Sequence, residues 1–187
     1  MILADGVVGQ MMEPIVPHKY SPSVELPPKD WVLDGCEGRP PRVIKSLFMG
    51  EGELEQRNYK LKEKYDRMRA NEVLYEEVGT DDAEVLLVAF GIAARVCLSA
   101  QRQLRKEGIP VGLFRPITLF PFPELELRRA SRGKKILVVE MNLGQMVEDV
   151  KLSVDNPQDV EFYGRPGGAI ITPEEVIQQV KGCLQRV

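Results

Sequence analysis

Apolar runs and segments of helical period alternate four times between residue 82 and the end of the chain, and this alternation limits the fold more than any other feature. The runs are EVLLVAFG, IPVGLFRP, KKILVVEMN and the shorter VEFYGRPGG. Strands that are covered on both faces of a sheet have this nearly continuous apolar character. The alternation therefore predicts an α/β fold, with a doubly wound, mostly parallel sheet and helices on both faces.

The sequence also contains signals for where the helices begin and end. Gly108 is placed to end the helix after the first run, because glycine is favoured just past a helix end. Thr172 and Glu175 have the spacing of a capping box at the start of the last helix. The same spacing makes Asn142 the predicted N-cap of the third helix, with Gln145 three residues on.

The first 81 residues read differently from the remainder. MILADG is typical of the end of a buried strand that runs into a glycine turn. Residues 15–50 are dense in proline and glycine, which predicts an extended segment that Trp31 helps to dock on another surface. Residues 51–78 predict one long polar helix with a narrow apolar seam from Leu54 to Tyr75.

Composition and charge exclude several classes of function. A net charge of -3 and a pI near 5.4 leave no basic footprint for nucleic acid. No apolar run approaches the roughly 20 residues of a membrane span, and no signal peptide is recognisable, so we expect a cytoplasmic protein without a membrane partner.

The metal-ligating and nucleophilic residue types are scarce. The three cysteines, Cys36, Cys97 and Cys183, are far apart and form no C-x-x-C, so the chain itself is expected to hold no metal and no iron–sulfur cluster. His18 is the one histidine and lies in a proline-rich stretch, where we expect a surface loop. We therefore expect no catalytic triad and name no catalytic residue.

One short pattern occurs twice, first in DGVVGQMMEPI and later in EMNLGQMVEDV. Each copy places an apolar strand before an acidic residue, followed by Gly-Gln-Met and then a carboxylate. From the residues alone, two interpretations carry equal weight. Both copies are simply starts of capped helices, or both are turns that approach a ligand.

In an open α/β sheet, ligands bind outside the carboxyl ends of the strands, where the strand order reverses. Residues at the predicted strand ends are the candidates for that crevice or for a subunit interface. They are Gly91, Arg115, Glu140, Asn142, Gly144, Gln145 and Arg165. A mutual ion pair of Arg115 with Glu140, without any ligand, is an equally weighted alternative. VAFGIAA is not a dinucleotide fingerprint, and no phosphate-binding P-loop motif is present.

Several segments taken together resemble the alpha subunit of 2-oxoacid:ferredoxin (acceptor) oxidoreductases. The segments are ILADGVVGQMMEP, RPITLFPFPE, ILVVEMNLGQMVEDV and VEFYGRPGG, and the resemblance covers essentially the whole chain. The stretch WVLDGCEGRPPRVIKSLF is most similar to the branched-chain, 2-oxoisovalerate type, and the 2-oxoglutarate type comes second.

The resemblance implies three regions. Residues 1–14 would be the last strand and turn of a domain that binds the pyrimidine half of thiamine diphosphate, because the family's alpha subunit is longer than this chain. Residues 15–81 would be a linker containing the long polar helix. Residues 82–187 would form an α/β domain similar to the transketolase C-terminal domain.

The resemblance also implies chemistry and partners. The reaction would be oxidative decarboxylation of a 2-oxoacid to acyl-CoA and CO2, with thiamine diphosphate and Mg as cofactor, coenzyme A as co-substrate and ferredoxin as electron acceptor. A thiamine-binding beta subunit and ferredoxin-like or gamma subunits would be the partners, and the iron–sulfur clusters would lie only on those partners.

Within the chain, the resemblance would place residues of the first Gly-Gln-Met copy nearest the cofactor in the intact assembly. They are Asp5, Gly6, Gly9, Gln10 and Met11. No segment matches the family's activating glutamate region, so the isolated chain is expected to be inactive. Two other functions stay open: a non-catalytic assembly or binding module, and the C-terminal domain of a transketolase or of a dehydrogenase E1 beta chain. GQMVEDV and the linker argue against the last.

Overall fold

A computed structural model describes residues 1–4, 6–15, 17, 25, 28–29 and 31–185. The chain divides into two compact units, one made of Met1–Met11 together with Lys64–Val187, and the other of Met12–Glu63. Each unit is described separately.

The first unit contains a five-stranded sheet in the order β1-β3-β2-β4-β5. The strands are β1 (Tyr75–Val78), β2 (Val85–Val88), β3 (Val111–Pro116), β4 (Lys135–Glu140) and β5 (Val160–Gly164). β1 pairs antiparallel with β3, and the other neighbours are parallel. The connections contain α3 (Gly91–Lys106), α4 (Glu124–Ser131), α5 (Met146–Ser153) and a 3-10 turn (Pro157–Asp159), and α6 (Pro173–Gln185) follows the last strand.

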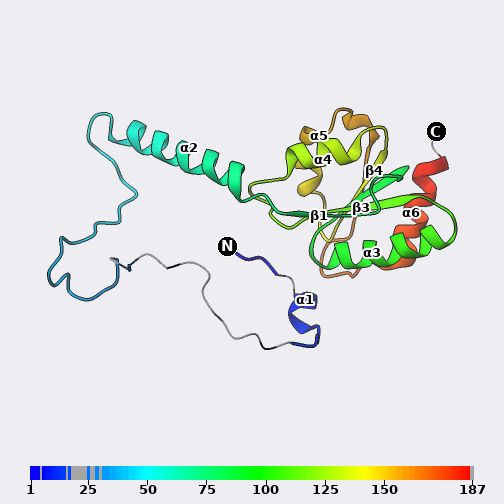
Figure 1. The fold of residues 1–187 in the computed structure, drawn as a ribbon, viewed down its shortest axis with the longest axis horizontal. Coiled ribbons are helices and arrows are strands. Elements are labelled where there is room, and N and C mark those ends of the chain that lie inside the picture. The colour runs from blue at the N-terminus through cyan, green and yellow to red at the C-terminus, as the bar shows by residue number, and fades with distance from the viewer. Residues whose placement is uncertain (5, 16, 18–24, 26–27, 30, 186–187) are drawn as a thin grey trace. The chain divides into compact units, whose positions relative to one another are not determined.

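Helices cover both faces of this sheet, with α3 and α6 on one side and α4 and α5 on the other (Figure 1). Alternate residues of β2 supply the two cores. Val85 and Leu87 pack in the cluster that includes α3 and α6. Leu86 and Val88 pack in the cluster that includes α4 and α5. The predicted doubly wound, mostly parallel α/β fold is confirmed for this unit.

Two of the predicted helix boundaries are confirmed. Gly108 has a φ of 82° and follows Glu107, the C-cap of α3, and its amide donates to the Arg105 carbonyl. At the start of α6, the Glu175 amide donates to the Thr172 hydroxyl, and the Thr172 amide donates to the Glu175 carboxylate. The capping box therefore forms with both of its hydrogen bonds.

The long helix is shorter than its sequence pattern predicted. α2 spans Glu53–Asn71, and Tyr75 begins β1 instead of extending the apolar seam of the helix. Tyr75 stacks on Phe114 with ring centroids 5.4 Å apart. The prediction of one helix over residues 51–78 was wrong because pairing with β3 and this aromatic contact favour a strand here, against the local helical pattern.

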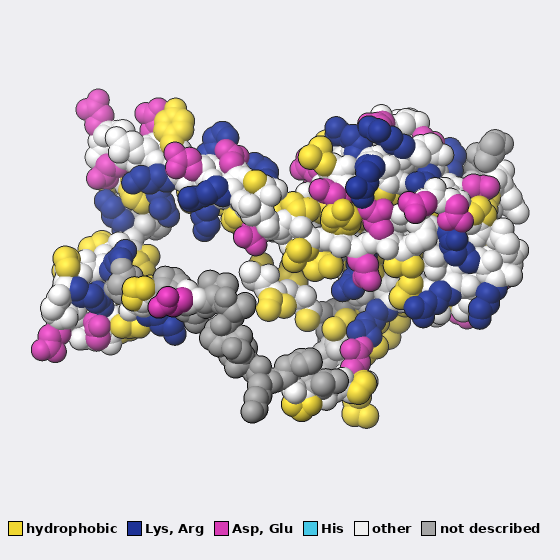
Figure 2. Space-filling model, viewed as in Figure 1, with side chains coloured by type: hydrophobic (Ala, Val, Ile, Leu, Met, Phe, Trp, Pro, Cys, Tyr) yellow, Lys and Arg dark blue, Asp and Glu magenta, His cyan; other side chains and the backbone are white. Residues whose placement is uncertain are grey.

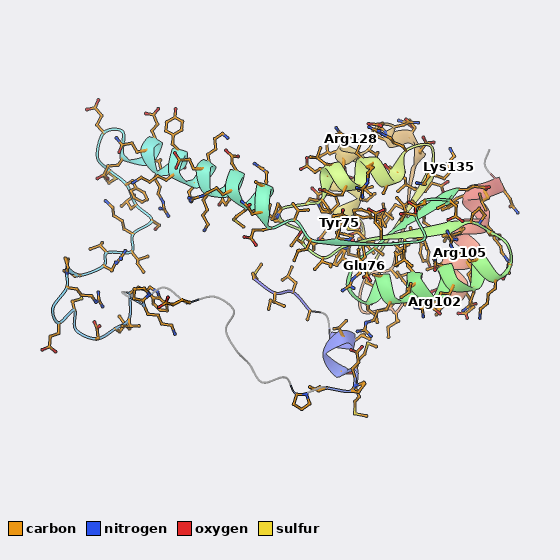
Figure 3. The ribbon with its side chains drawn as sticks, in the orientation of Figure 1. Tyr75, Glu76, Arg102, Arg105, Arg128 and Lys135 are labelled. Carbon is orange, nitrogen blue, oxygen red and sulfur yellow. The ribbon has the colours of Figure 1, made fainter. Side chains whose placement is uncertain are left out.

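Arg105 ties the connection between β1 and β2 to α3 (Figure 3). Its guanidinium donates to the Gly79 carbonyl at 2.6 Å, to the Asp82 carboxylate at 2.6 Å and to the Val111 carbonyl at 2.8 Å. This ion pair lowers the pKa of Asp82. Gly79 has a φ of 60°, so its turn favours a residue without a Cβ.

The amino-terminal strand expected in MILADG is absent from the described residues 1–4. Met1, Ile2 and Leu3 are exposed by 109%, 96% and 69%, and no strand is assigned to them. The short helix α1 (Gly6–Gln10) follows and contacts α3. None of the described strands pairs with these residues, and a strand this short requires neighbouring strands, so the expected buried strand stays a prediction. The division into regions at residues 14 and 81 stays a prediction.

The second unit holds a turn that follows Trp31. Arg39 closes this turn with hydrogen bonds to the Val32 carbonyl and to the Asp34 carboxylate, at 2.7 and 2.6 Å. The Trp31 side chain is 61% exposed. Its docking on another surface therefore remains a prediction.

No helix in the described ranges combines the length and the hydropathy that a membrane crossing requires.

The capping box of α6 yields a stability prediction. Thr172→Ala removes the acceptor for the Glu175 amide, so we expect the free energy of unfolding to fall by about 1 kcal/mol. Urea denaturation followed by circular dichroism measures this change. Gln178→Ala, an exposed change in the same helix, is the control and should alter stability by less than about 0.5 kcal/mol. Equal losses in the two variants would contradict the cap.

Candidate functional site

The switch point of the sheet lies between β2 and β4, its two central parallel strands. After β2 the chain passes through α3 to β3 on one side, and after β4 it passes through α5 to β5 on the other side. The carboxyl ends of these strands lead into Gly91 and into the turn Met141–Gln145. This edge is where α/β proteins of this topology bind their ligands.

The Glu140 carboxylate organises this edge, although the side chain is only 1% exposed. It accepts hydrogen bonds from the Met146 and Val147 amides, both at 3.0 Å, and from the Gln145 amide at 3.3 Å. The Asn142 side-chain amide donates to it at 3.0 Å. The first amides of a helix have no partner within the helix, so a buried carboxylate at this position satisfies them and complements the helix dipole.

Asn142 was predicted as the N-cap of this helix, and that prediction was wrong. α5 begins at Met146 with Gln145 in the N-cap position, and no side chain of that residue caps the helix. The Asn142 side chain instead shapes the turn, because its oxygen accepts the Gly144 amide at 2.7 Å. Gly144 has a φ of 104°, a conformation that L-residues rarely adopt.

The hydrogen bonds around Glu140 define the role of this carboxylate. Four donors already occupy the Glu140 carboxylate, and water is nearly excluded from it. A carboxylate offers about four acceptor positions, so these donors use the hydrogen-bonding capacity of Glu140. Glu140 is therefore a positioning residue that fixes the turn, while Leu143, 81% exposed, and Gln145 lie at the surface.

Two more candidates lie at or beside this turn. The Arg165 backbone amide donates to the Glu140 carbonyl at 3.2 Å. The Arg165 guanidinium reaches the α6 start instead, where it pairs with Glu175 at 2.8 Å and also donates to the Ile170 carbonyl. Gly91 begins α3 at the end of the neighbouring strand, with a φ of 57°.

Arg115 is not part of this group. It lies in β3 opposite Glu76 of the antiparallel edge strand β1, and the two side chains form an ion pair at 2.9 Å. Because β2 separates β3 from β4, Arg115 does not pair with Glu140, and the mutual ion pair considered from the sequence is wrong. Figure 3 labels Glu76 and Tyr75 on this edge strand.

The first Gly-Gln-Met copy adopts a different local structure from the second. Gly6, Gly9 and Gln10 lie within α1, and Met11 follows it, whereas Gly144 and Gln145 precede α5. Asp5, the counterpart of Glu140, lies outside the described residues. The sequence already contains one difference, since Val7 stands where the second copy has Asn142 and cannot form the bonds of that amide. The two copies of the pattern therefore differ in local structure.

The close approach of β5 to this turn was missed by sequence reasoning. A Cβ on Gly164 would collide with the Asn142 carbonyl and with the Phe162 ring, so the close approach of β5 to the turn requires glycine there. Phe162 is 38% exposed. The glycine after VEFY was the one signal in the sequence, because a glycine at a strand end often marks a close backbone approach.

No group of three or more His, Cys, Asp or Glu side chains among the described residues is arranged to hold a metal ion. Cys97 and Cys183 are buried, and burial raises the pKa of the Cys97 thiol. His18 lies outside the described residues, so its predicted place in a surface loop is not tested.

The Glu140 network yields a prediction. Glu140→Gln places an amide group, which itself donates hydrogen bonds, against the helix amides, so we expect a loss of about 3 kcal/mol in the free energy of unfolding. Glu148→Gln in α5 is the matched control. Because the Glu148 side chain is exposed, this change should lower the free energy of unfolding by less than about 1 kcal/mol. Chemical denaturation of the two variants measures the difference. A Glu140→Gln chain as stable as the control would contradict the network.

Glu175 yields a prediction about pH. Its hydrogen bond from the Thr172 amide, followed by its charge interaction with Arg165, lowers the pKa of this carboxyl below its ordinary value of 4.5. A lowered folded-state pKa contributes stability above the unfolded-state pKa, and that contribution is lost as the pH falls through the folded-state value.

The midpoint temperature of Glu175→Gln should therefore lie below that of the native chain at pH 7, and the gap should narrow as the pH falls below 4.5. Differential scanning calorimetry across this range measures the gap. Glu174→Gln, a change at the exposed neighbour, is the control and should show no such narrowing. A gap that widens on acidification would contradict the assignment.

Comparison with known proteins places this fold in a family. Residues 83–176 match the family described as pyruvate:ferredoxin oxidoreductase core domain II. The ketoisovalerate oxidoreductase subunit VorB of Methanothermobacter thermautotrophicus is 41% identical over 97% of this chain and 51% of its own length. The 2-oxoglutarate synthase subunit KorA of Methanothermobacter marburgensis is 38% identical over 55% of this chain and 28% of its own length.

A solved structure has a similar fold. It is the 2-oxoglutarate:ferredoxin oxidoreductase of Magnetococcus marinus, which was determined with 2-oxoglutarate, coenzyme A and succinyl-CoA bound. The match has a TM-score of 0.65 and 24% identity, and it covers 74% of this chain and 24% of that one. The present chain spans about half the length of the VorB proteins it matches, at 51%. The chain belongs to the pyruvate:ferredoxin oxidoreductase core domain II family and is a homologue of the alpha subunits of 2-oxoacid:ferredoxin oxidoreductases.

Proposed function

We propose that this chain functions in a thiamine-diphosphate-dependent 2-oxoacid:ferredoxin oxidoreductase, as alpha-subunit sequence of the branched-chain type. The single observation that carries the proposal is the 41% identity to a ketoisovalerate oxidoreductase subunit over 97% of the chain. The 2-oxoglutarate type is the second candidate, with 38% identity over 55% of the chain. Greater coverage, at comparable identity, favours the branched-chain substrate.

The reaction would convert a branched-chain 2-oxoacid and coenzyme A to the acyl-CoA and CO2, and its two electrons would pass to ferredoxin. Thiamine diphosphate, when bound, supplies the electron sink that makes loss of CO2 feasible. Iron–sulfur clusters on partner subunits would carry the electrons onward, and a beta subunit would share the Mg-bound cofactor.

The described residues of α1 do not fit that cofactor by themselves. No charged side chain is found among these residues, which are Gly6, Gly9 and Gln10 of α1 and Met11 directly after it. A diphosphate bound through Mg requires oxygen ligands such as carboxylates. Their position beside the cofactor, together with Asp5, is therefore part of the proposal for the assembled enzyme. No chemical step is derived through them.

The role of the sheet domain follows from Glu140. A turn fixed by a saturated, buried carboxylate presents Leu143 in a defined position, and that side chain is 81% exposed. An exposed leucine on a rigid turn suits a subunit interface better than it suits catalysis. We therefore assign Leu143 and Gln145 to contact with a partner subunit of the complex.

The substrate assignment is testable in the assembled enzyme. The chain, tagged in its native cells, is purified under anaerobic conditions with whatever binds it. Coenzyme A-dependent reduction of a viologen dye is then compared for 3-methyl-2-oxobutanoate, 2-oxoglutarate and pyruvate. We expect 3-methyl-2-oxobutanoate to give a kcat/KM at least tenfold above the other two. Absence of 2-oxoacid-dependent reduction in a preparation that contains the partner subunits would contradict the proposal.

The interface assignment has its own test. Leu143→Asp should reduce the amount of co-purified partner subunit at least tenfold, because it buries a charge in the contact. Leu152→Asp is the matched control, since Leu152 is also 81% exposed and lies in α5. Circular dichroism of each chain checks that the fold is retained. Equal recovery of partner with the two variants would assign the contact elsewhere.

A further inference from the structure

A cavity of about 420 Å³ lies within the second unit, whereas the candidate site around Glu140 belongs to the first unit. An extended segment and the amino-terminal half of α2 line this cavity, which is open to solvent. Its lining consists of Val43, Ile44, Lys45, Phe48, Glu53, Gln56, Arg57 and Lys60. This volume falls within the range of about 300–1,000 Å³ that is usual for small-molecule sites.

The helical part of the lining is polar. The four residues from α2 have the spacing i, i+3, i+4 and i+7, which places them on one face of the helix. The opposing segment contributes the apolar side chains of Val43, Ile44 and Phe48. A helix that packed tightly on such a segment would present apolar residues to it. Leu54 is instead 54% exposed and does not line the cavity.

The charges of the cavity are unequal. Lys45 pairs with Glu53 at 3.3 Å and lies 5.0 Å from the centre of the Phe48 ring. Arg57 and Lys60 have no ion-pair or hydrogen-bond partner among the residues that the structure describes. Three cations face one carboxylate, so the lining is positive although the whole chain carries -3. Figure 2 shows Lys and Arg side chains along α2, interspersed with acidic ones.

We infer that this cavity binds a small organic anion, a phosphate ester that carries a flat or apolar group. Arg57 and Lys60 are two cations without an ion-pair partner among the described residues. An arginine can bind a phosphate with two parallel hydrogen bonds. The wall formed by Val43, Ile44 and Phe48 offers contact area for a ring. The inference goes beyond the proposed oxidoreductase reaction and does not depend on it.

Calorimetric titration of the purified full chain tests the inference at low and at physiological salt. The probes are AMP, inorganic phosphate and adenosine, which separate the anion from the ring, and tetraglutamate, which represents an acidic peptide. We expect AMP to bind at least tenfold more tightly than phosphate or adenosine alone, and its affinity to fall as salt increases.

The double variant Arg57→Gln with Lys60→Gln should weaken AMP binding at least tenfold, because charge-assisted hydrogen bonds are lost. The matched control is Arg102→Gln with Lys106→Gln, which removes the same charge from exposed positions of α3. It should change the affinity less than twofold, and Arg102 is labelled in Figure 3. The Phe48→Ser variant should prefer AMP over phosphate less strongly than the native chain does.

Three results would overturn the inference. The first is no binding of AMP or phosphate at concentrations up to about 10 mM. The second is an equal loss of affinity in both double variants, which would mean a general charge effect. The third is tighter binding of tetraglutamate than of AMP, which would assign the cavity to an acidic segment of a protein.

Discussion

The complete burial of β2 is the constraint on which the rest of the structure depends. All four of its residues, Val85 to Val88, are 0% exposed, although the strand is short. A strand with apolar side chains on both faces needs parallel neighbours on both edges and helices above and below it. The chain meets that need by sending α3 to one face and α4 and α5 to the other. The strand order reverses between the parallel neighbours β2 and β4, and this reversal creates the switch point.

Glu140 supplies hydrogen-bond acceptors to backbone amides that this packing separates from water. The helix after β4 starts directly above a dry sheet, so water does not reach the amides of Met146 and Val147. Buried amides without acceptors would each be costly, and a buried carboxylate without donors would be more so. The carboxylate and these amides satisfy each other, and the Asn142 side chain and the Gln145 backbone amide donate to the same carboxylate. The same residues that look in the sequence like an acid at the mouth of an active site therefore hold a turn in place.

The chain belongs to the pyruvate:ferredoxin oxidoreductase core domain II family, and its two units contribute different features. The sheet domain contributes an edge at which Leu143 is exposed and Glu140 is buried and hydrogen-bonded. The second unit contributes different physical features, a positive cavity beside α2 with Arg57 and Lys60 unpaired among the described residues. The chain spans about half the length of its VorB relatives, at 51%.

Local patterns in the sequence were sufficient to predict the parallel strands, the position of Gly108 at the end of α3 and the capping box of Thr172 with Glu175. Burial periodicity and capping depend on residues within a few positions of one another, so they are visible in the chain itself. Tertiary structure alone decided that Tyr75 lies in a strand, that Arg115 pairs with Glu76 and that Glu140, not Asn142, caps α5. Each of those outcomes depends on a partner from another strand or on a carboxylate that burial has separated from water, and sequence spacing specifies neither.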